Sequence, residues 1–193
     1  MFHFNTEKAI QATATLLRLD ACWRMGRKRL LALLYLADRR SLQETGRPIV
    51  GGRLSALKFG PIHSQAYDLI KGSRHDEQLW SKHFRNDGYH ICLADDPGSL
   101  ALSRYEVDLL NELTSQFQGD DDFDVAAVTH TFGEYQAAYV KDTSRSISFE
   151  SIIDEVIRES NMDKEKADAR KESILRDAAA QSYFDGIFSE AAH

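Results

Sequence analysis

The sequence has little cysteine, little proline and no long hydrophobic run. Its two cysteines, Cys22 and Cys92, form no CxxC pair, which argues against a disulfide framework and a four-cysteine zinc site. Only three prolines occur, so the composition does not resemble a disordered linker. No segment approaches the ~18 uninterrupted apolar residues of a membrane span, and the first residues lack the basic and then apolar pattern of a signal peptide. These absences predict a folded cytoplasmic protein with no membrane contact.

Motifs of the common enzyme classes are also missing. The sequence contains no GxxxxGKS or GxxxxGKT, no GxGxxG, no HExxH and no GxSxG. Its net charge of −6 repels a polyanion at long range. We therefore predict a protein that is not an enzyme, with no catalytic residues, no cofactor and no metal, and we do not expect nucleic acid as its partner.

What is present is the composition of an ordinary globular protein, with 42% hydrophobic and 28% charged residues. The 193 residues exceed the ~100–150 at which domain sizes cluster. After Ser160 the composition changes to closely mixed charges. We therefore predict one compact domain over residues 1–160 and a C-terminal helical extension over 161–193.

Apolar residues spaced by three and four predict that most of the chain is helical. A first helix begins at Asn5 or Thr6 and carries Ile10, Ala14, Leu17 and Ala21 on one face. A second begins at Arg27, ends by Gly46 and is apolar nearly all round, which indicates a central position. Further helices are predicted from Gly60-Pro61, from the capping box Ser103–Glu106 to about Phe117, over 125–129, over 132–140 and from Ser148.

Two stretches carry β signals. Residues 53–59 fit a strand or a short helix. Two alternating runs, Trp80-Lys82-Phe84 and Tyr89-Ile91-Leu93, flank an Asp87-Gly88 turn and predict a hairpin. The predicted fold class is therefore mainly α (α+β): a compact helical domain with a small β-hairpin and a C-terminal helical extension.

Three clusters of polar residues are candidates for chemistry, and a structural role is favoured for each. His75, His83 and His90, with Asp76 or Glu77, match no known spacing of metal ligands, although a metal-dependent hydrolase stays an alternative. The acidic run over 120–124 lacks the glycine and distal glutamate of a calcium loop and suits the positive end of a helix. Thr129-His130 has no matching nucleophile and carboxylate, so we expect it to cap backbone groups and to hydrogen-bond across a loop.

Basic residues flank the second helix and leave a DNA-binding autorepressor as a further alternative. They are Arg24, Arg27, Lys28, Arg29, Arg39 and Arg40. Arg39 and Arg40 lie in the last turns of that helix, where cations complement its dipole, and no helix-turn-helix spacing is evident. Salt-sensitive operator binding would be the mark of this alternative.

Four blocks of sequence, in order and spacing, resemble the SocA-like antitoxin family, also called the Panacea domain. They are KRLLALLYLADR at 28–39, GRPI at 46–49, ALKFGPI at 56–62 and YDL at 67–69. Thr129-His130 resembles a Thr-His pair near the end of that domain, and the resemblance runs from about Thr6 to Ser160. Two positions depart from the family pattern: Gly52, where an acidic residue is frequent, and Tyr135, where tryptophan is frequent.

The resemblance implies a mainly helical domain with a small β element, found in two-gene toxin–antitoxin systems. Members block varied toxins by direct binding, and some deliver the toxin to a protease. No catalytic residues are carried over, because the matched positions have the residue types of packing, turn and cap positions. We therefore predict an antitoxin that neutralises a toxin encoded by the adjacent gene, with a proteolytic adaptor as the alternative.

The extension is the predicted source of specificity, because one shared domain meets unrelated toxins. Its charged run at 164–172 precedes an apolar stripe, the pattern of a helix that lies in a partner's groove. The residues predicted to bind the partner are Ile174, Leu175, Tyr183, Phe184, Ile187 and Phe188. The alternative is that this stripe packs on its own domain or on a second copy in a homodimer.

Overall fold

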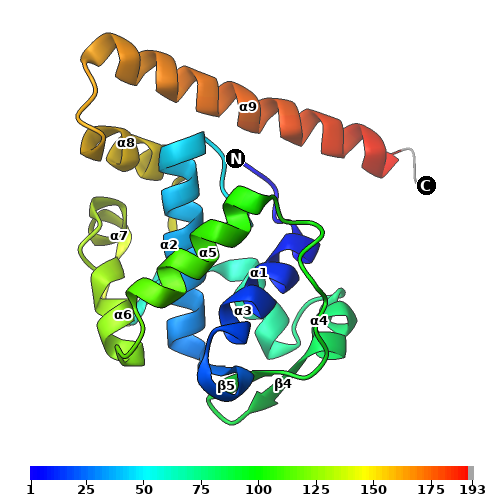
Figure 1. Ribbon diagram of the computed structural model, residues 1–193. Helices are drawn as coiled ribbons and strands as arrows, with labels where there is room; N and C mark the ends of the chain where they lie inside the picture. Colours follow the sequence, from blue (N-terminus) through cyan, green and yellow to red (C-terminus); the bar gives the residue numbers. More distant parts are fainter. Residues whose placement is uncertain (191–193) are drawn as a thin grey trace.

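The computed structural model describes the chain from residue 1 to residue 190, with the backbone alone at residues 21 and 185–190 (Figure 1). It is mainly helical, with two small antiparallel sheets, as predicted. The helices are α1 (Thr6–Arg18), the 3-10 helix η1 (Ala21–Trp23), α2 (Arg27–Thr45), α3 (Ser64–Lys71), α4 (Glu77–His83), α5 (Arg104–Gln116), α6 (Asp122–Thr129), α7 (Gly133–Ala138), α8 (Phe149–Glu159) and α9 (Lys164–Glu190). The strands are β1 (Arg24–Gly26), β2 (Leu54–Leu57), β3 (Gly60–His63), β4 (Phe84–Asp87), β5 (His90–Leu93) and β6 (Arg145–Ile147).

Helix α2 forms the centre of the molecule, which confirms the prediction from its composition. Its leucines Leu30, Leu33 and Leu34 are fully buried, and α1, α5, α6 and α8 all pack against it (Figure 1). The helix ends where Gly46 takes a left-handed conformation with φ of +84° and donates its N–H to the Leu42 carbonyl. A helix with neighbours on all sides needs apolar side chains all round.

The two sheets have the strand orders β1-β5-β4 and β3-β2-β6. The predicted hairpin is present as β4 and β5, with Asp87 opposite His90, but its turn is Gly88-Tyr89 rather than the predicted Asp87-Gly88. Two strands were not predicted: β1, which pairs Met25 with Ile91, and β6, which pairs Ser146 with Ser55. Both missed strands are three residues long, too short for an alternating pattern.

Three predicted boundaries were wrong. No helix begins at Gly60-Pro61, because these residues pair with Leu57 and Ala56 in the β2-β3 hairpin, and α3 begins only at Ser64. Trp80 and Lys82 lie in α4 rather than in a strand, so the first strand of the predicted hairpin begins at Phe84. The first helix ends at Arg18, before Ala21.

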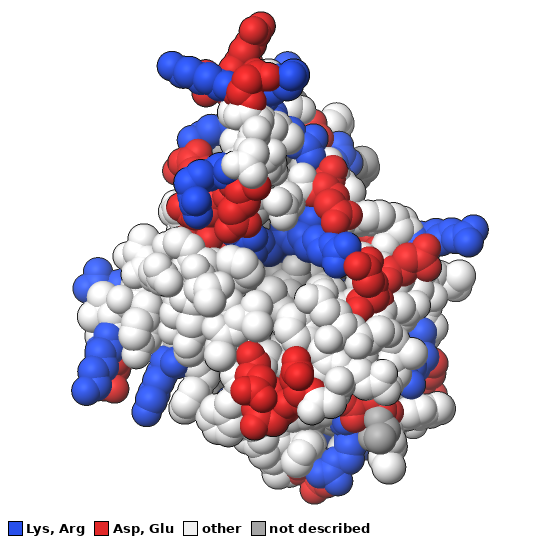
Figure 2. Space-filling view, turned by 60° about the vertical axis from the view of Figure 1, so that its left-hand side comes forward, with Lys and Arg blue, Asp and Glu red and all other residues white. Residues whose placement is uncertain are grey.

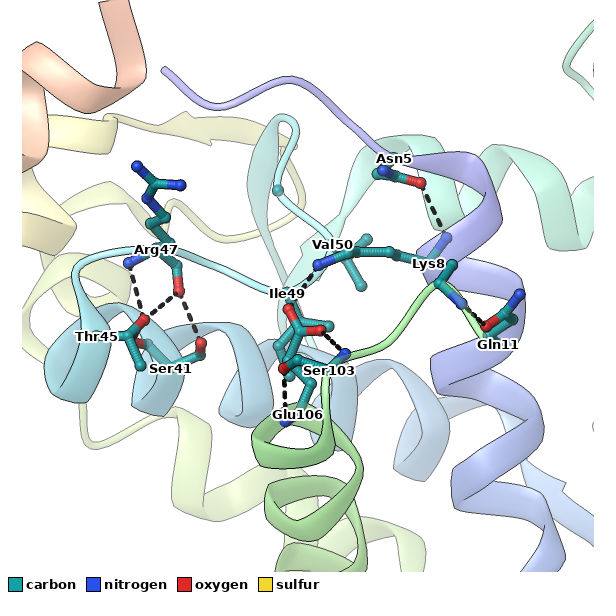
Figure 3. A network of polar contacts seen from close by, with 12 residues as sticks. Asn5, Lys8, Gln11, Ser41, Thr45, Arg47, Ile49, Val50, Ser103 and Glu106 are labelled. Atoms are coloured by element: carbon teal, nitrogen blue, oxygen red, sulfur yellow. Dashed lines mark hydrogen bonds and ion pairs between the residues drawn. The ribbon is translucent and has the colours of Figure 1, made fainter. Parts of the chain in front are cut away.

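Side-chain caps at three helix starts confirm predictions made from local sequence. Asn5 accepts a hydrogen bond from the Lys8 N–H, and Ser148 accepts one from the Ser151 N–H. Ser103 and Glu106 form the complete capping box of α5. Glu106 also accepts a hydrogen bond from Lys8 Nζ at 2.7 Å, so one carboxylate joins the starts of α1 and α5 (Figure 3).

The buried apolar residues form two clusters, and α9 contributes to the second. Ile174 and Ala178 are almost fully buried in a cluster that also contains Ile153 and Val156 of α8. The first half of α9 is therefore packed on α8 and the end of α2, along one side of the molecule (top of Figure 1). Within residues 1–190, no helix is both long enough and apolar enough to cross a bilayer.

Candidate partner-binding surface

Polar contacts hold the first half of α9 against the body of the protein. Arg47, just beyond the end of α2, makes an ion pair with Asp177 at 3.0 Å. Arg170 donates to the carbonyls of Gln43 and Glu44 in the last turn of α2, at 3.4 and 3.3 Å. Lys171 pairs with Asp154 of α8. These contacts and the buried Ile174 fix the direction in which the rest of α9 projects.

The following part of α9 presents aromatic side chains to solvent. Tyr183 is 68% exposed and Phe184 is 57% exposed, and their rings meet edge to face with centroids 5.9 Å apart. Phe184 borders a groove of about 370 Å³ that is also lined by Lys8, Arg47 and Asp177. The exposed Phe184 ring therefore lies beside a groove that contains both signs of charge.

The structure divides the six predicted partner-binding residues into three groups. Ile174 is 2% exposed and Leu175 is partly buried, and both pack against the protein's own domain. Tyr183 and Phe184 are exposed. The side chains of Ile187 and Phe188 lie outside the described residues. A role in partner binding stays a prediction, and among the described residues it now concerns Tyr183 and Phe184.

A buried polar network links α2 to α7 and α8. The Glu134 carboxylate is fully buried, and its Oε1 accepts hydrogen bonds from the Tyr35 hydroxyl and from Arg39 Nε, the latter at 2.7 Å. Arg39 also makes two 2.8 Å hydrogen bonds to Glu159 and lies over the Phe132 ring at 3.8 Å. Burial opposes the charge of Arg39, but its bonds to Glu159 and Glu134 outweigh this effect and raise its pKa. Burial and the neighbouring Glu134 raise the pKa of Tyr35 well above its usual value.

A second buried carboxylate, Asp38, shapes the turn that follows α2. Its two oxygens accept the backbone N–H groups of Ile49, Val50 and Gly51 at 2.8–2.9 Å. His63 Nε2 lies 3.6 Å from Asp38 Oδ2. Burial raises the pKa of Asp38, while His63 and the three backbone hydrogen bonds act in the opposite direction. Asp38 thus stabilises a turn, one of the structural roles predicted for the matched positions, and all its described contacts are internal.

The histidines and aspartates considered for metal binding do not come together. His83 contacts Asp95 at 3.2 Å, while His90 lies in β5 and His75 precedes α4. Within the described part of the chain, no three His, Cys, Asp or Glu side chains are placed as a metal ion requires. In the acidic run, Asp121 caps α6 by accepting the N–H groups of residues 123 and 124.

The Thr129-His130 pair also lies in a structural environment. Thr129 is fully buried and donates from its hydroxyl to the Ala126 carbonyl at 2.6 Å, as a residue near a helix end does. His130 stacks on Tyr135, with centroids 4.9 Å apart and planes 9° apart. Tyr135 in turn donates to the Leu57 carbonyl at 2.8 Å. The pair therefore joins α6 and α7 to the β2-β3 hairpin.

Most of the basic residues that flank α2 have internal partners. Arg29 donates to the carbonyls of Asp120 and Phe117, Arg24 lies 3.7 Å from Asp87, and Arg40 pairs with Glu44 and Glu112. Arg39 and Arg40 line a groove of about 300 Å³. On the face seen in Figure 2, Lys and Arg side chains lie in a hollow with Asp and Glu side chains on either side. The positive charges of Arg39 and Arg40, near the C-terminal end of α2, are thus paired with glutamates of the same chain.

Comparison with known proteins identifies the family. A family model described as "Antitoxin SocA-like, Panacea domain" matches residues 30–136. The chain belongs to this family. No curated protein and no solved structure matches it. The SocA-like region runs from the first turn of α2 into α7, so α1, α8 and α9 lie outside it.

Two blocks that first suggested the SocA-like family contact each other in the fold. Gly60 of the Gly-Pro block has φ of +116°, and a Cβ placed on it would lie 2.6 Å from Thr129 Oγ1.

The two positions that depart from the family pattern, Gly52 and Tyr135, lie in different surroundings. Gly52 borders a cavity of about 30 Å³ together with Asp38 and His63, whereas Tyr135 stacks between His130 and Tyr139.

Proposed function

We propose that this SocA-like protein is an antitoxin that neutralises a cognate toxin by direct binding, without catalysis of its own. Membership of the family supports a role in a toxin–antitoxin system. The observation that carries the binding mechanism is the exposed pair Tyr183 and Phe184 on a helix that is anchored about one and a half turns earlier, at Ala178. We propose that residues 161–193 form an extension to the domain over 1–160 and that the toxin, the product of the adjacent gene, contacts this extension.

The chemistry of the α9 surface suits a protein partner. Energetic hot spots in interfaces are enriched in aromatic residues with a polar rim around them. Tyr183 and Phe184 supply aromatic area, and the neighbouring groove supplies Lys8, Arg47 and Asp177 as rim groups. Because Arg47 and Ile174 hold the helix in place, little conformational entropy is lost when a partner binds.

A truncation that removes residues 181–193 tests this proposal. It leaves Ile174 and Ala178 in the core, whereas removal of the whole extension would open the second apolar cluster. We expect the truncated protein to fold and to lose protection of cells that co-express the adjacent toxin gene, since the aromatic anchors are gone. Growth of the cells and isothermal titration of the purified pair are the measurements.

A point variant refines the result. Tyr183→Ser combined with Phe184→Ser should weaken binding by about 30-fold or more, since a single hot-spot residue contributes about 2 kcal/mol or more and the two effects need not add. Leu100→Ser is the matched control, because Leu100 is almost completely exposed and does not line the groove beside Phe184. Full protection by a folded truncated protein would rule out α9 as the toxin-binding element.

A proteolytic adaptor would give a different result: the toxin would disappear only in cells that contain a given protease.

A further inference from the structure

Three exposed aromatic side chains from distant parts of the chain surround Lys28 at the start of α2. Lys28 Nζ lies 3.7 Å from the ring centroid of Phe59, 4.0 Å from that of Phe123 and 5.5 Å from that of Tyr89. Phe59 and Phe123 also meet edge to face at 6.4 Å. All three rings remain exposed, Phe123 by 60%. A monomer rarely leaves several large rings together in water without a use for them.

A groove of about 240 Å³ opens beside this cluster, and we call it the Lys28 groove. Its apolar lining comes from Leu31, Ala32, Leu57, Pro61, Ile62 and Tyr67, and its rim from Arg27, Lys28, Phe59 and Tyr89. An apolar floor with a few polar groups at the rim is the usual form of a binding site. The groove is large enough to receive one apolar side chain of a partner.

The cations at the rim make no ion pair with a side chain that the structure describes, although Asp122 lies near enough to Lys28 to interact with its charge. Lys28 Nζ contacts the aromatic rings of Phe59 and Phe123 instead. Arg27 makes one long hydrogen bond to the Gly88 carbonyl, and its Nε is buried without a partner. This contrasts with Arg39 and Arg40, whose charges are matched by glutamates.

We propose that the Lys28 groove is a second interaction surface, which binds a segment of the toxin that presents a carboxylate beside an apolar side chain. The apolar side chain would fill the groove, and the carboxylate would pair with Lys28 between the rings of Phe59 and Phe123. A cation already shielded from water by aromatic faces gains a strong charge-assisted hydrogen bond from an incoming carboxylate. The inference rests on the proposed neutralisation by direct binding: Phe59, Tyr89 and Phe123 lie in the antitoxin-family region, and Lys28 lies two residues before it.

A nucleic acid strand fits this surface less well than an acidic protein segment. Stacking aromatic residues beside lysine also occur in proteins that bind single strands. Here, however, Phe123 lies within the acidic run, next to Asp121, Asp122 and Asp124, and the chain has a net charge of −6. A single carboxylate can approach Lys28, whereas a row of phosphates would meet these aspartates.

Two synthetic peptides of 12 residues test the chemistry of the groove without the toxin. Both carry a central Leu-Phe pair, preceded by a single Asp in one peptide and by a single Lys in the other, with uncharged polar residues elsewhere. In fluorescence anisotropy, the acidic peptide should bind at least about tenfold more tightly than the basic one, and Lys28→Met should remove that preference. Lys82→Met, an exposed lysine on α4, is the matched control and should retain it. Equal binding of both peptides, or no binding of either, would overturn the proposed chemistry.

The purified product of the adjacent toxin gene is used to test whether the toxin is the partner that binds in the Lys28 groove. Lys28→Glu should weaken toxin binding by about 30-fold or more, while Lys82→Glu, with the same change in net charge, should alter it by less than about threefold. If the wild-type protein does not bind the toxin, the proposed function fails. If the wild type binds and Lys28→Glu binds equally well, only the inference about the groove fails. It also fails if the groove proves to bind a single-stranded oligonucleotide or, by sedimentation, a second copy of the chain.

Discussion

Replacing Glu134 by leucine is expected to lower the free energy of unfolding by about 3 kcal/mol, because it leaves a buried arginine short of a partner. The Glu134 carboxylate accepts hydrogen bonds from Arg39 and from the Tyr35 hydroxyl, and none of these three side chains is more than slightly exposed. Leucine removes the acceptor for both donors at once. Arg39 keeps Glu159, which limits the loss. Urea denaturation followed by circular dichroism measures the change.

Two further variants identify the cause of that loss. Glu134→Gln keeps an acceptor oxygen for Arg39 and Tyr35 and removes only the charge, so it should lower the stability by about half as much. Glu112→Leu breaks the exposed pair with Arg40 and should change stability by about 0.5 kcal/mol or less. Equal effects of Glu134→Leu and Glu112→Leu would show that the buried network contributes no more than a surface ion pair.

Local signals in the sequence were sufficient to predict most helices. The limits of α2, the capping box of Ser103 and Glu106 and the cap at Ser148 each depend on residues within a few positions of one another. β6 depends instead on β2, about ninety residues earlier, and its three residues carry no pattern of their own. The same holds for β3, where the proline of Gly60-Pro61 suggested the first turn of a helix although the hairpin with β2 determines the local structure.

The two candidate surfaces, the α9 stripe and the Lys28 groove, also differ in how far the sequence could predict them. The α9 stripe was visible because its residues follow one another on one helix, although the pattern alone did not show that Ile174 packs inward and Tyr183 outward. The Lys28 groove and the Phe123 ring beside it bring together residues from α2, from the β2-β3 turn, from the β4-β5 turn and from α6. In the sequence, Phe59 and Phe123 look like core residues, since an isolated aromatic is more often buried than exposed.

The contact between the Gly-Pro and Thr-His blocks explains why one fold needs both. Gly60 closes the β2-β3 hairpin in a conformation that L-residues rarely adopt, with φ of +116°. Its missing side chain leaves the space that the buried Thr129 hydroxyl occupies. Thr129 and His130 in turn hold α6 and α7 against the hairpin through Gly60 and Tyr135. The packing of α6 and α7 on the β2-β3 hairpin therefore requires a residue without a Cβ at position 60.

Gly60→Ala is accordingly expected to lower the free energy of unfolding by about 3 kcal/mol, from backbone strain and from overpacking against Thr129. Gly88→Ala is the matched control: Gly88 also has a positive φ, of +57°, but no atom lies within 4 Å of the added carbon. Gly88→Ala should lower the free energy of unfolding by about 1 kcal/mol, from backbone strain alone. Adding Thr129→Ala to Gly60→Ala should cost less than the sum of the single changes, because the smaller side chain makes room. Additive losses, or equal losses at Gly60 and Gly88, would show that the two blocks do not depend on each other.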